Sequence, residues 1–226
     1  MTRSVLVPAL LSGALVVASP AAAVTPITFS QFFQADSSTP VTYSGGSGGA
    51  TITGSFPAFA NVLAFGVPGI YPVLATIDAS TTGAIVHVGA DFQQDGWAGT
   101  ISFDLGGFNF LTAVFTDGNL SVTPGPTQSA GLVVSGSCGT TLCYTSDVPP
   151  LDVSGLTVGN FALSFSGIES LVAPGTRFGP GGGDFVASVS GTFAGAVPEP
   201  ATWALLVAGF GLVGLMARRR QLLSIA

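Results

Sequence analysis

The residues best suited to catalysis or ligand binding in this sequence lie between positions 87 and 97. His87 is the only histidine, and Asp91, Asp95 and Trp97 follow it. A histidine held by a carboxylate can act as the base for a serine nucleophile, which would make the protein a hydrolase. No nucleophile elbow, the strand-to-helix turn that carries such a serine, supports a triad here. The alternation around His87 instead favours a side chain that points from a β-strand into solvent.

The same run offers a binding site as an alternative. The carboxylates of Asp91 and Asp95 are hard oxygen ligands of the kind that calcium prefers, and an exposed indole at Trp97 could stack on a sugar. The run matches no calcium-loop signature. A polar loop with a partly buried tryptophan is therefore the favoured interpretation, and a glycan or calcium contact at these three residues is the alternative.

The N-terminus is typical of a secretory signal peptide. Arg3 precedes an apolar run over 5–17, and Ala21 and Ala23 are the small residues that a signal peptidase reads. We expect cleavage after residue 23, with Val24 as the mature N-terminus. Because there is no twin-arginine pair, we expect export through the general secretory translocon, with folding afterwards.

The C-terminus contains three consecutive sorting features. Pro198-Glu199-Pro200 is followed by Trp203-Ala204, an uncharged stretch over 201–217, and Arg218-Arg219-Arg220. As a helix the uncharged stretch would be about 25 Å long, slightly short for a bilayer core of roughly 30 Å. The sequence predicts a transmembrane helix at 201–217. The arginines place residues 221–226 in the cytoplasm and the body outside it.

In order and spacing these features resemble the PEP-CTERM sorting signal in its PEP-x-x-W-A variant, over residues 198–220. The resemblance implies recognition of Pro198-Glu199-Pro200 by an exosortase, a transpeptidase-like membrane enzyme of Gram-negative bacteria that make extracellular polysaccharide. It also implies that the helix is removed after a transient stay in the inner membrane. The protein would then reach the cell surface or the extracellular matrix.

The charge of the body limits its partners. Ten of the eleven acidic residues lie within 24–197, where Arg177 is the only basic residue. Such a surface repels phosphate backbones, so we expect no nucleic-acid binding. It also repels anionic polysaccharide unless divalent cations bridge the two, so a neutral or cation-bridged glycan is the better expected partner.

Cys138 and Cys143 are the only cysteines and lie five positions apart. In an exported protein we expect them to form a disulfide that clamps a hairpin tip or loop. A zinc site needs four ligands, and a redox pair needs a C-x-x-C spacing that these residues lack. The sequence therefore predicts no metal site and no cofactor.

Apolar residues alternate with polar ones in several stretches of the body. The alternation covers 101–105, 161–165 and 185–193, and it is typical of half-buried strands. Further short strands are expected at 50–56, 60–65, 73–78, 83–92, 130–135 and 140–145. Short strands separated by glycine- and proline-bearing turns predict one all-β domain over 24–197, a β-sandwich or jelly roll.

Two local features refine the expected strands. Asp117-Gly118 suits a two-residue hairpin turn, which would set Phe115 opposite Leu120. A shift in the apolar phase across Gly159-Asn160 predicts a bulge.

The sequence as a whole predicts a non-enzymatic, exosortase-sorted surface or matrix protein associated with exopolysaccharide or biofilm. A carbohydrate-binding module at the cell surface is the first alternative, and a secreted hydrolase is the second.

Overall fold

The computed structural model describes residues 26–46, 48–65, 68–89, 91–123, 128–149, 151–170, 183–196 and 210. Within these ranges, no helix is long and apolar enough to cross a membrane. The predicted signal peptide and its cleavage residues Ala21, Ala23 and Val24 lie outside them. So do the predicted sorting residues Pro198, Glu199, Pro200, Trp203, Ala204, Arg218, Arg219 and Arg220.

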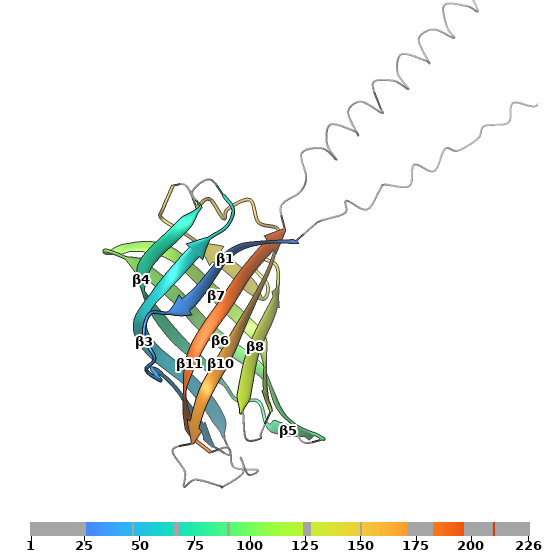
Figure 1. Cartoon of the computed structure of the whole chain (residues 1–226). Coiled ribbons are helices and arrows are strands. Elements are labelled where there is room, and N and C mark those ends of the chain that lie inside the picture. The colour runs from blue at the N-terminus through green and yellow to red at the C-terminus, as the bar shows by residue number, and fades with distance from the viewer. Residues whose placement is uncertain are drawn as a thin grey trace, which may run out of the picture.

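Eleven strands in the described part of the chain form a single sheet (Figure 1). In chain order they are β1 (Pro26–Gln34), β2 (Val41–Gly46), β3 (Gly49–Val62), β4 (Gly69–Thr81), β5 (Ile85–Val88), β6 (Asp91–Leu105), β7 (Phe108–Thr123), β8 (Ser129–Gly136), β9 (Leu142–Thr145), β10 (Val158–Ser170) and β11 (Phe185–Ala196).

The sheet closes on itself as an antiparallel barrel. Going round it, β6 pairs with β4, then come β3, β1, β11, β10, β8 and β7, and β7 pairs with β6 again. The all-β prediction is confirmed, but the predicted sandwich or jelly roll is wrong. Alternating strands look alike in both architectures, and only the pairing of the first strand with the last and of β6 with β7 decides between them.

Three positions in the barrel wall are each filled by two strands in line. β1 and β2 both pair with β3, β8 and β9 both pair with β7, and β4 and β5 both pair with β6. The chain leaves the wall between the two members of each pair and then resumes the same direction. These interruptions explain why the barrel is built from more strands than it has wall positions.

The barrel interior is filled with aromatic and aliphatic side chains. Along β11, the residues at odd positions from Phe185 to Phe193 are buried, as the alternation predicts. Phe193 lies within ring-contact distance of five other aromatic residues, Phe29, Phe32, Phe103, Tyr144 and Phe161. The crowding is tight enough that a Cβ at Gly191 would lie 2.4 Å from the Phe32 ring. Glycine at 191 therefore leaves the space that the ring occupies.

Two of the predicted local features are wrong. Asp117 and Gly118 do not form a hairpin turn, because β7 runs straight through them. Asp117 has a φ of 61°, and the register with β6 shifts beside Gly118. They form a bulge instead, since a residue with positive φ fits either structure. The β6–β7 hairpin turns at Gly106 and Gly107, both with positive φ.

The bulge predicted at Gly159-Asn160 is also displaced. Both residues lie in regular register with β8 and β11, and the irregularity of β10 falls between Ser166 and Glu169. Gly167, with a φ of 59°, lies inside that irregularity. The apolar phase shift arises because the segment before Val158 caps the barrel and does not belong to the strand.

Candidate sorting site at one pole of the barrel

The first and last strands meet at one end of the barrel, which we call the sorting pole: the starts of β1 and β10 and the end of β11. Pro26 pairs with Ala196, and Val158 pairs with the same residue from the other side (Figure 1). The predicted leader ends three residues before Pro26, and the Pro-Glu-Pro tripeptide begins two residues after Ala196. Along the chain, both predicted processing sites therefore lie within a few residues of this pole.

The body is hydrogen-bonded up to its last described strand residue. Besides its two ladder neighbours, Ala196 accepts two hydrogen bonds at its carbonyl oxygen, from the Thr157 backbone N–H at 3.1 Å and the Thr157 hydroxyl at 3.2 Å. Ala196 is itself buried. An edge this well paired does not fray easily, because opening it would expose several backbone groups at once.

The segment between β9 and β10 covers the sorting pole. Leu151 and Val153 are buried there, and Leu156 packs so closely on Gly195 that a Cβ at that glycine would lie 2.6 Å from its side chain. Asp152 accepts hydrogen bonds from the hydroxyl and backbone N–H of Ser154, which lower the pKa of its carboxyl group. The pole is thus closed by an apolar cap with a polar outer side.

Tyr144, on β9, connects several wall strands near the sorting pole. Its hydroxyl donates to the carbonyl of Asn160 at 2.7 Å and also lies 3.5 Å from that of Ala194. Burial raises the pKa of this hydroxyl well above its usual value of 10. The Tyr144 ring packs edge-on against Phe29 and Phe193. Tyr144 therefore links the apolar interior to the C-terminal end of β11.

Comparison with known proteins finds a match in the segment that is C-terminal to this pole. The family model described as the PEP-CTERM protein-sorting motif matches residues 196–220. Residues 196–220 are a PEP-CTERM protein-sorting motif. The match begins at Ala196, where the hydrogen-bonded wall ends. The protein is therefore exported and sorted by an exosortase toward the cell surface, as the resemblance implied. No curated protein and no solved structure matches the chain.

Outside the PEP-CTERM motif, the predicted sugar contact at Trp97 is corrected. Trp97 is 0% exposed, so its indole faces the barrel interior and cannot stack on an external sugar. Its register position opposite Gly118 explains this burial, since a Cβ at Gly118 would crowd Trp97. The favoured interpretation, a partly buried tryptophan, is closer to the structure, although Trp97 is fully buried and lies in β6 and not in a loop.

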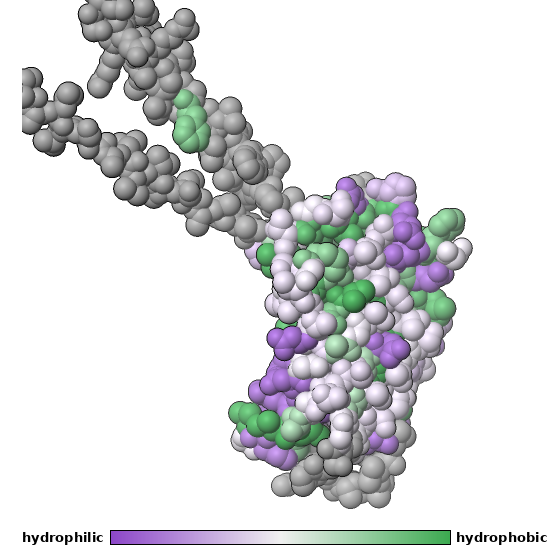
Figure 2. Space-filling model, turned by 180° about the vertical axis from the view of Figure 1, so that it is seen from behind, coloured by the Kyte–Doolittle hydropathy of each residue, from purple (hydrophilic) through white to green (hydrophobic). Residues whose placement is uncertain are grey.

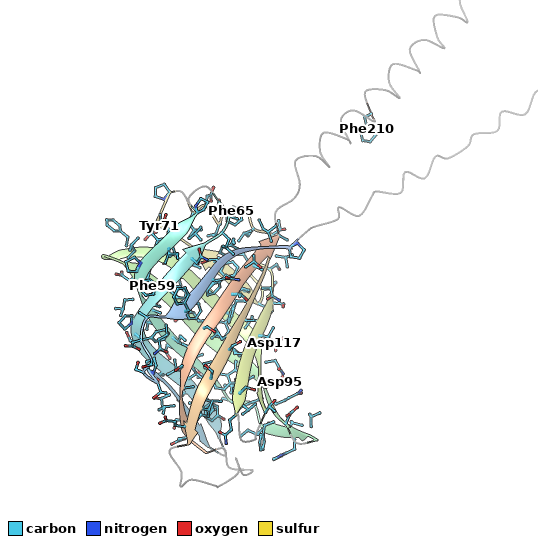
Figure 3. The ribbon with its side chains drawn as sticks, in the orientation of Figure 1. Phe59, Phe65, Tyr71, Asp95, Asp117 and Phe210 are labelled. Atoms are coloured by element: carbon cyan, nitrogen blue, oxygen red, sulfur yellow. A yellow bond between two sulfur atoms is a disulfide. The ribbon has the colours of Figure 1, made fainter. Side chains whose placement is uncertain are left out.

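The two aspartates near Trp97 lie on β6 at the other end of the barrel. The Asp95 carboxylate accepts a hydrogen bond from the Asn119 side chain, and Figure 3 places Asp95 and Asp117 low on the same side of the barrel. Among the described residues, no three of His, Cys, Asp or Glu gather as metal ligands would. The calcium alternative at Asp91 and Asp95 therefore gains no support from the described part of the chain.

His87 lies on β5, as its alternation predicts. It is exposed, and its ring packs edge-on against Phe92 with centroids 4.6 Å apart. In the described part of the chain, the His87 ring thus packs against an aromatic residue rather than against Asp91 or Asp95. This geometry does not support the hydrolase hypothesis, which needs a carboxylate that holds His87 as the base.

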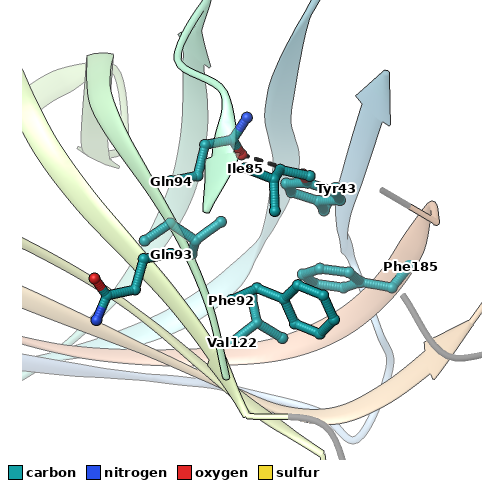
Figure 4. Close-up of a pocket in the computed structure, with 8 residues that line it drawn as sticks. Tyr43, Ile85, Phe92, Gln93, Gln94, Val122 and Phe185 are labelled. Carbon is teal, nitrogen blue, oxygen red and sulfur yellow. Dashed lines mark hydrogen bonds between the residues drawn. The ribbon is translucent and has the colours of Figure 1, made fainter. Parts of the chain in front are cut away.

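A small apolar cavity lies at the pole opposite the sorting pole (Figure 4). Tyr43, Phe92, Val122 and Phe185 are among its walls, and its volume is about 20 Å³. A cavity of that size holds about one water molecule and no sugar ring. Above it, the Tyr43 hydroxyl donates to the side-chain oxygen of the buried Gln94 at 3.2 Å. Burial, and to a smaller extent the charge of Asp184, raises the pKa of Tyr43.

The predicted disulfide between Cys138 and Cys143 is present. It lies where the chain leaves the wall between β8 and β9. Thr141 donates its hydroxyl to the Ser135 carbonyl, and its own carbonyl accepts from Thr116 on β7. The disulfide therefore clamps an interrupted wall strand, which is a more specific role than the loop or hairpin tip expected.

Sequence reasoning missed the residues that hold the end of β11. Thr157, Tyr144 and Pro26 each contact it from a different part of the chain. None of them belongs to a motif, and their role depends on long-range pairing. No local signal could have identified them.

Proposed function

We propose that this protein is a non-enzymatic surface or matrix protein, whose barrel is delivered by exosortase processing to an extracellular polysaccharide or biofilm matrix. The observation that carries the proposal is the position of the sorting motif. It begins where the wall ends at Ala196, so the complete barrel lies on the N-terminal side of any cleavage at 198–200. Removal of the tail would leave every described strand in place.

The proposed topology is the one that the sequence predicts. The leader at 1–23 is removed by signal peptidase after export, the stretch at 201–217 holds the chain in the inner membrane, and residues 221–226 stay in the cytoplasm. The barrel then stays on the periplasmic side, tethered to the inner membrane at its sorting pole, until exosortase cleaves the tail. Because β1 must pair with β11, the barrel closes only after nearly the whole body has crossed the membrane.

A structural role is supported by the character of the body. The interior is packed with apolar side chains, and the apolar cavity beside Tyr43 is too small for a sugar. A wider hollow of about 680 Å³ opens to solvent beside Ser44, Thr51 and Ser80, so size alone does not exclude a glycan there. The wall is acidic, which favours a neutral glycan or one bridged by divalent cations over an anionic polymer. The carbohydrate-module alternative loses its proposed stacking residue with the burial of Trp97.

The sorting part of the proposal is tested by intact-protein mass spectrometry of the native protein, in hosts with and without the exosortase. We expect a species that begins at Val24 and ends near Pro198, released or modified only when the enzyme is present. A chain that extends through Ala226 in both strains would refute the proposal and leave a membrane-anchored periplasmic domain.

The matrix part is tested separately by cell fractionation. We expect the processed protein to sediment with the host's extracellular polysaccharide and to be released when that polysaccharide is removed genetically. Chelation of divalent cations distinguishes a cation-bridged contact from a neutral one. Equal amounts of free protein with and without the polysaccharide would contradict a matrix role.

A further inference from the structure

The sorting pole carries exposed apolar side chains on five separate segments. Five large apolar residues are exposed there, at strand ends or next to them: Ile27, Leu63, Ile70, Phe108 and Val158. Ile70 is 61% exposed and Phe108 is 66% exposed, the two largest values among the large apolar residues of the barrel. Soluble surfaces tolerate single residues of this kind, but a ring of them around one pole suggests a contact surface.

Register confirms that these residues surround the same end. Ile27 pairs with Gly195, one residue before Ala196, and Val158 pairs with Ala196 itself. Ile70 pairs with Asn61 near the end of β3, and Phe108 begins β7 after the Gly106-Gly107 turn. On the face in Figure 2, apolar surface gathers near both ends of the barrel, while most of the wall between them is pale or purple.

The length of chain between the wall and the apolar stretch limits what can cover this ring. Four residues, 197–200, separate Ala196 from the start of the uncharged stretch at 201. The path from Ala196 to residue 201 has five Cα–Cα steps, so at most about 3.6 Å per residue it can hold the pole no more than roughly 18 Å from that stretch. If the stretch lies in a bilayer, the sorting pole lies within roughly 18 Å of the hydrocarbon core, close enough to reach the headgroups.

We propose that the apolar ring of the sorting pole, Ile27, Leu63, Ile70, Phe108 and Val158, docks on the lipid surface of the membrane that holds the tail. The inference rests on the membrane-anchored state in the proposed function. Its consequence is an upright barrel that presents the Pro-Glu-Pro tripeptide at the membrane surface, where an integral membrane enzyme can reach it. Removal of the tail then leaves only this shallow contact, which is weak enough to permit release.

Negative charge near the sorting pole affects which lipids this surface can contact. Asp104, Asp147 and Asp152 are exposed near the same pole, and an anionic bilayer would repel them. We therefore expect docking to be tighter on a zwitterionic surface than on an anionic one, and raised salt to reduce the difference.

The test uses the full chain without its leader, reconstituted into phosphatidylcholine vesicles that contain brominated acyl chains, which quench tryptophan on contact. In a Trp203→Phe background, single variants Phe108→Trp and Ile70→Trp report on the sorting pole. Val86→Trp is the matched control, because Val86 is 54% exposed but lies on β5 at the opposite pole. Trp97 is fully buried and gives the same background in every variant.

We expect brominated lipid to cause a loss of fluorescence at positions 108 and 70 but not at position 86. Quenching at none of the three positions, in protein that floats with the vesicles, would overturn the docking proposal and leave the anchored state intact. Equal quenching at all three would also overturn it, because the barrel would then lie on its side. Protein that does not float with the vesicles would overturn both the docking proposal and the anchored state.

Discussion

At the sorting pole the backbone ladder is complete up to Ala196, whereas at the opposite pole side chains take over where the ladder is interrupted. Apolar residues cap the first, and the Tyr144 hydroxyl on β9 donates to the Asn160 carbonyl on β10. The second relies on Gln94, whose side chain bonds both Tyr43 and the Gly83 carbonyl. Polar side chains also act at the sorting pole, where Thr157 and Tyr144 donate to carbonyls of β10 and β11. These contacts all lie within the body, so removal of the tail should disturb this end little.

The largest expected effect compares one phenylalanine from each pole. Phe29→Ala should lower the free energy of unfolding by about 3–5 kcal/mol, since Phe29 is fully buried against Tyr144 and Phe193. Phe92→Ala should cost less, because Phe92 borders a cavity and is slightly exposed. Urea titration followed by Trp97 fluorescence in the Trp203→Phe chain measures both. A larger loss for Phe92→Ala would reverse the comparison.

The second effect concerns the disulfide between β8 and β9. Replacing both Cys138 and Cys143 by serine should lower the free energy of unfolding by about 2 kcal/mol, the value expected for closing a ring this short. The same titration measures it, with the unmodified chain under a thiol reductant as the control. If neither the substitution nor reduction changed the midpoint, Thr141 and its hydrogen bonds would suffice to hold β9.

The third effect depends on pH. Burial raises the pKa values of Tyr144 and Tyr43 above 10, so the folded barrel keeps protons that the unfolded chain loses. The free energy of unfolding should therefore be unaffected below about pH 10 and fall above it. The slope is at most about 1.4 kcal/mol per pH unit for each tyrosine.

Substitution separates the two tyrosines. Tyr144→Phe should remove more of the alkaline slope than Tyr43→Phe, because the shift is larger at Tyr144. Denaturant midpoints between pH 9 and pH 11 measure the difference. An unchanged slope in both variants would show that other groups cause the alkaline loss.

The smallest expected effect tests the hydrogen-bonded interruption between β4 and β5. The buried Thr81 hydroxyl donates to the Asp95 carbonyl at 2.7 Å and accepts from the Gly83 backbone N–H at 2.8 Å. Thr81→Val should cost about 1 kcal/mol, less than loss of the disulfide. Thr82→Val, at an exposed neighbouring position, is the control, and an equal loss in both variants would contradict the role of this hydroxyl.

Prediction from sequence succeeded where a single segment carries the signal. The alternation over 185–193 gave both the strand and its buried face, and the two cysteines gave the disulfide. It failed at Asp117-Gly118, because the same positive φ serves a turn and a bulge and only the neighbouring strands distinguish them. At Trp97 it predicted a partly buried side chain in a loop, whereas the side chain is fully buried in strand β6.

The sequence by itself determined the destination of this protein, since the sorting motif is a linear pattern of residue types at fixed spacing. It also determined that the body is all β. Only the tertiary structure decided that the sheet closes into a barrel and that Pro26 meets Ala196 beside the motif. Both depend on pairing between residues far apart in the chain, and local periodicity, which sets which face of a strand is buried, cannot specify its neighbour.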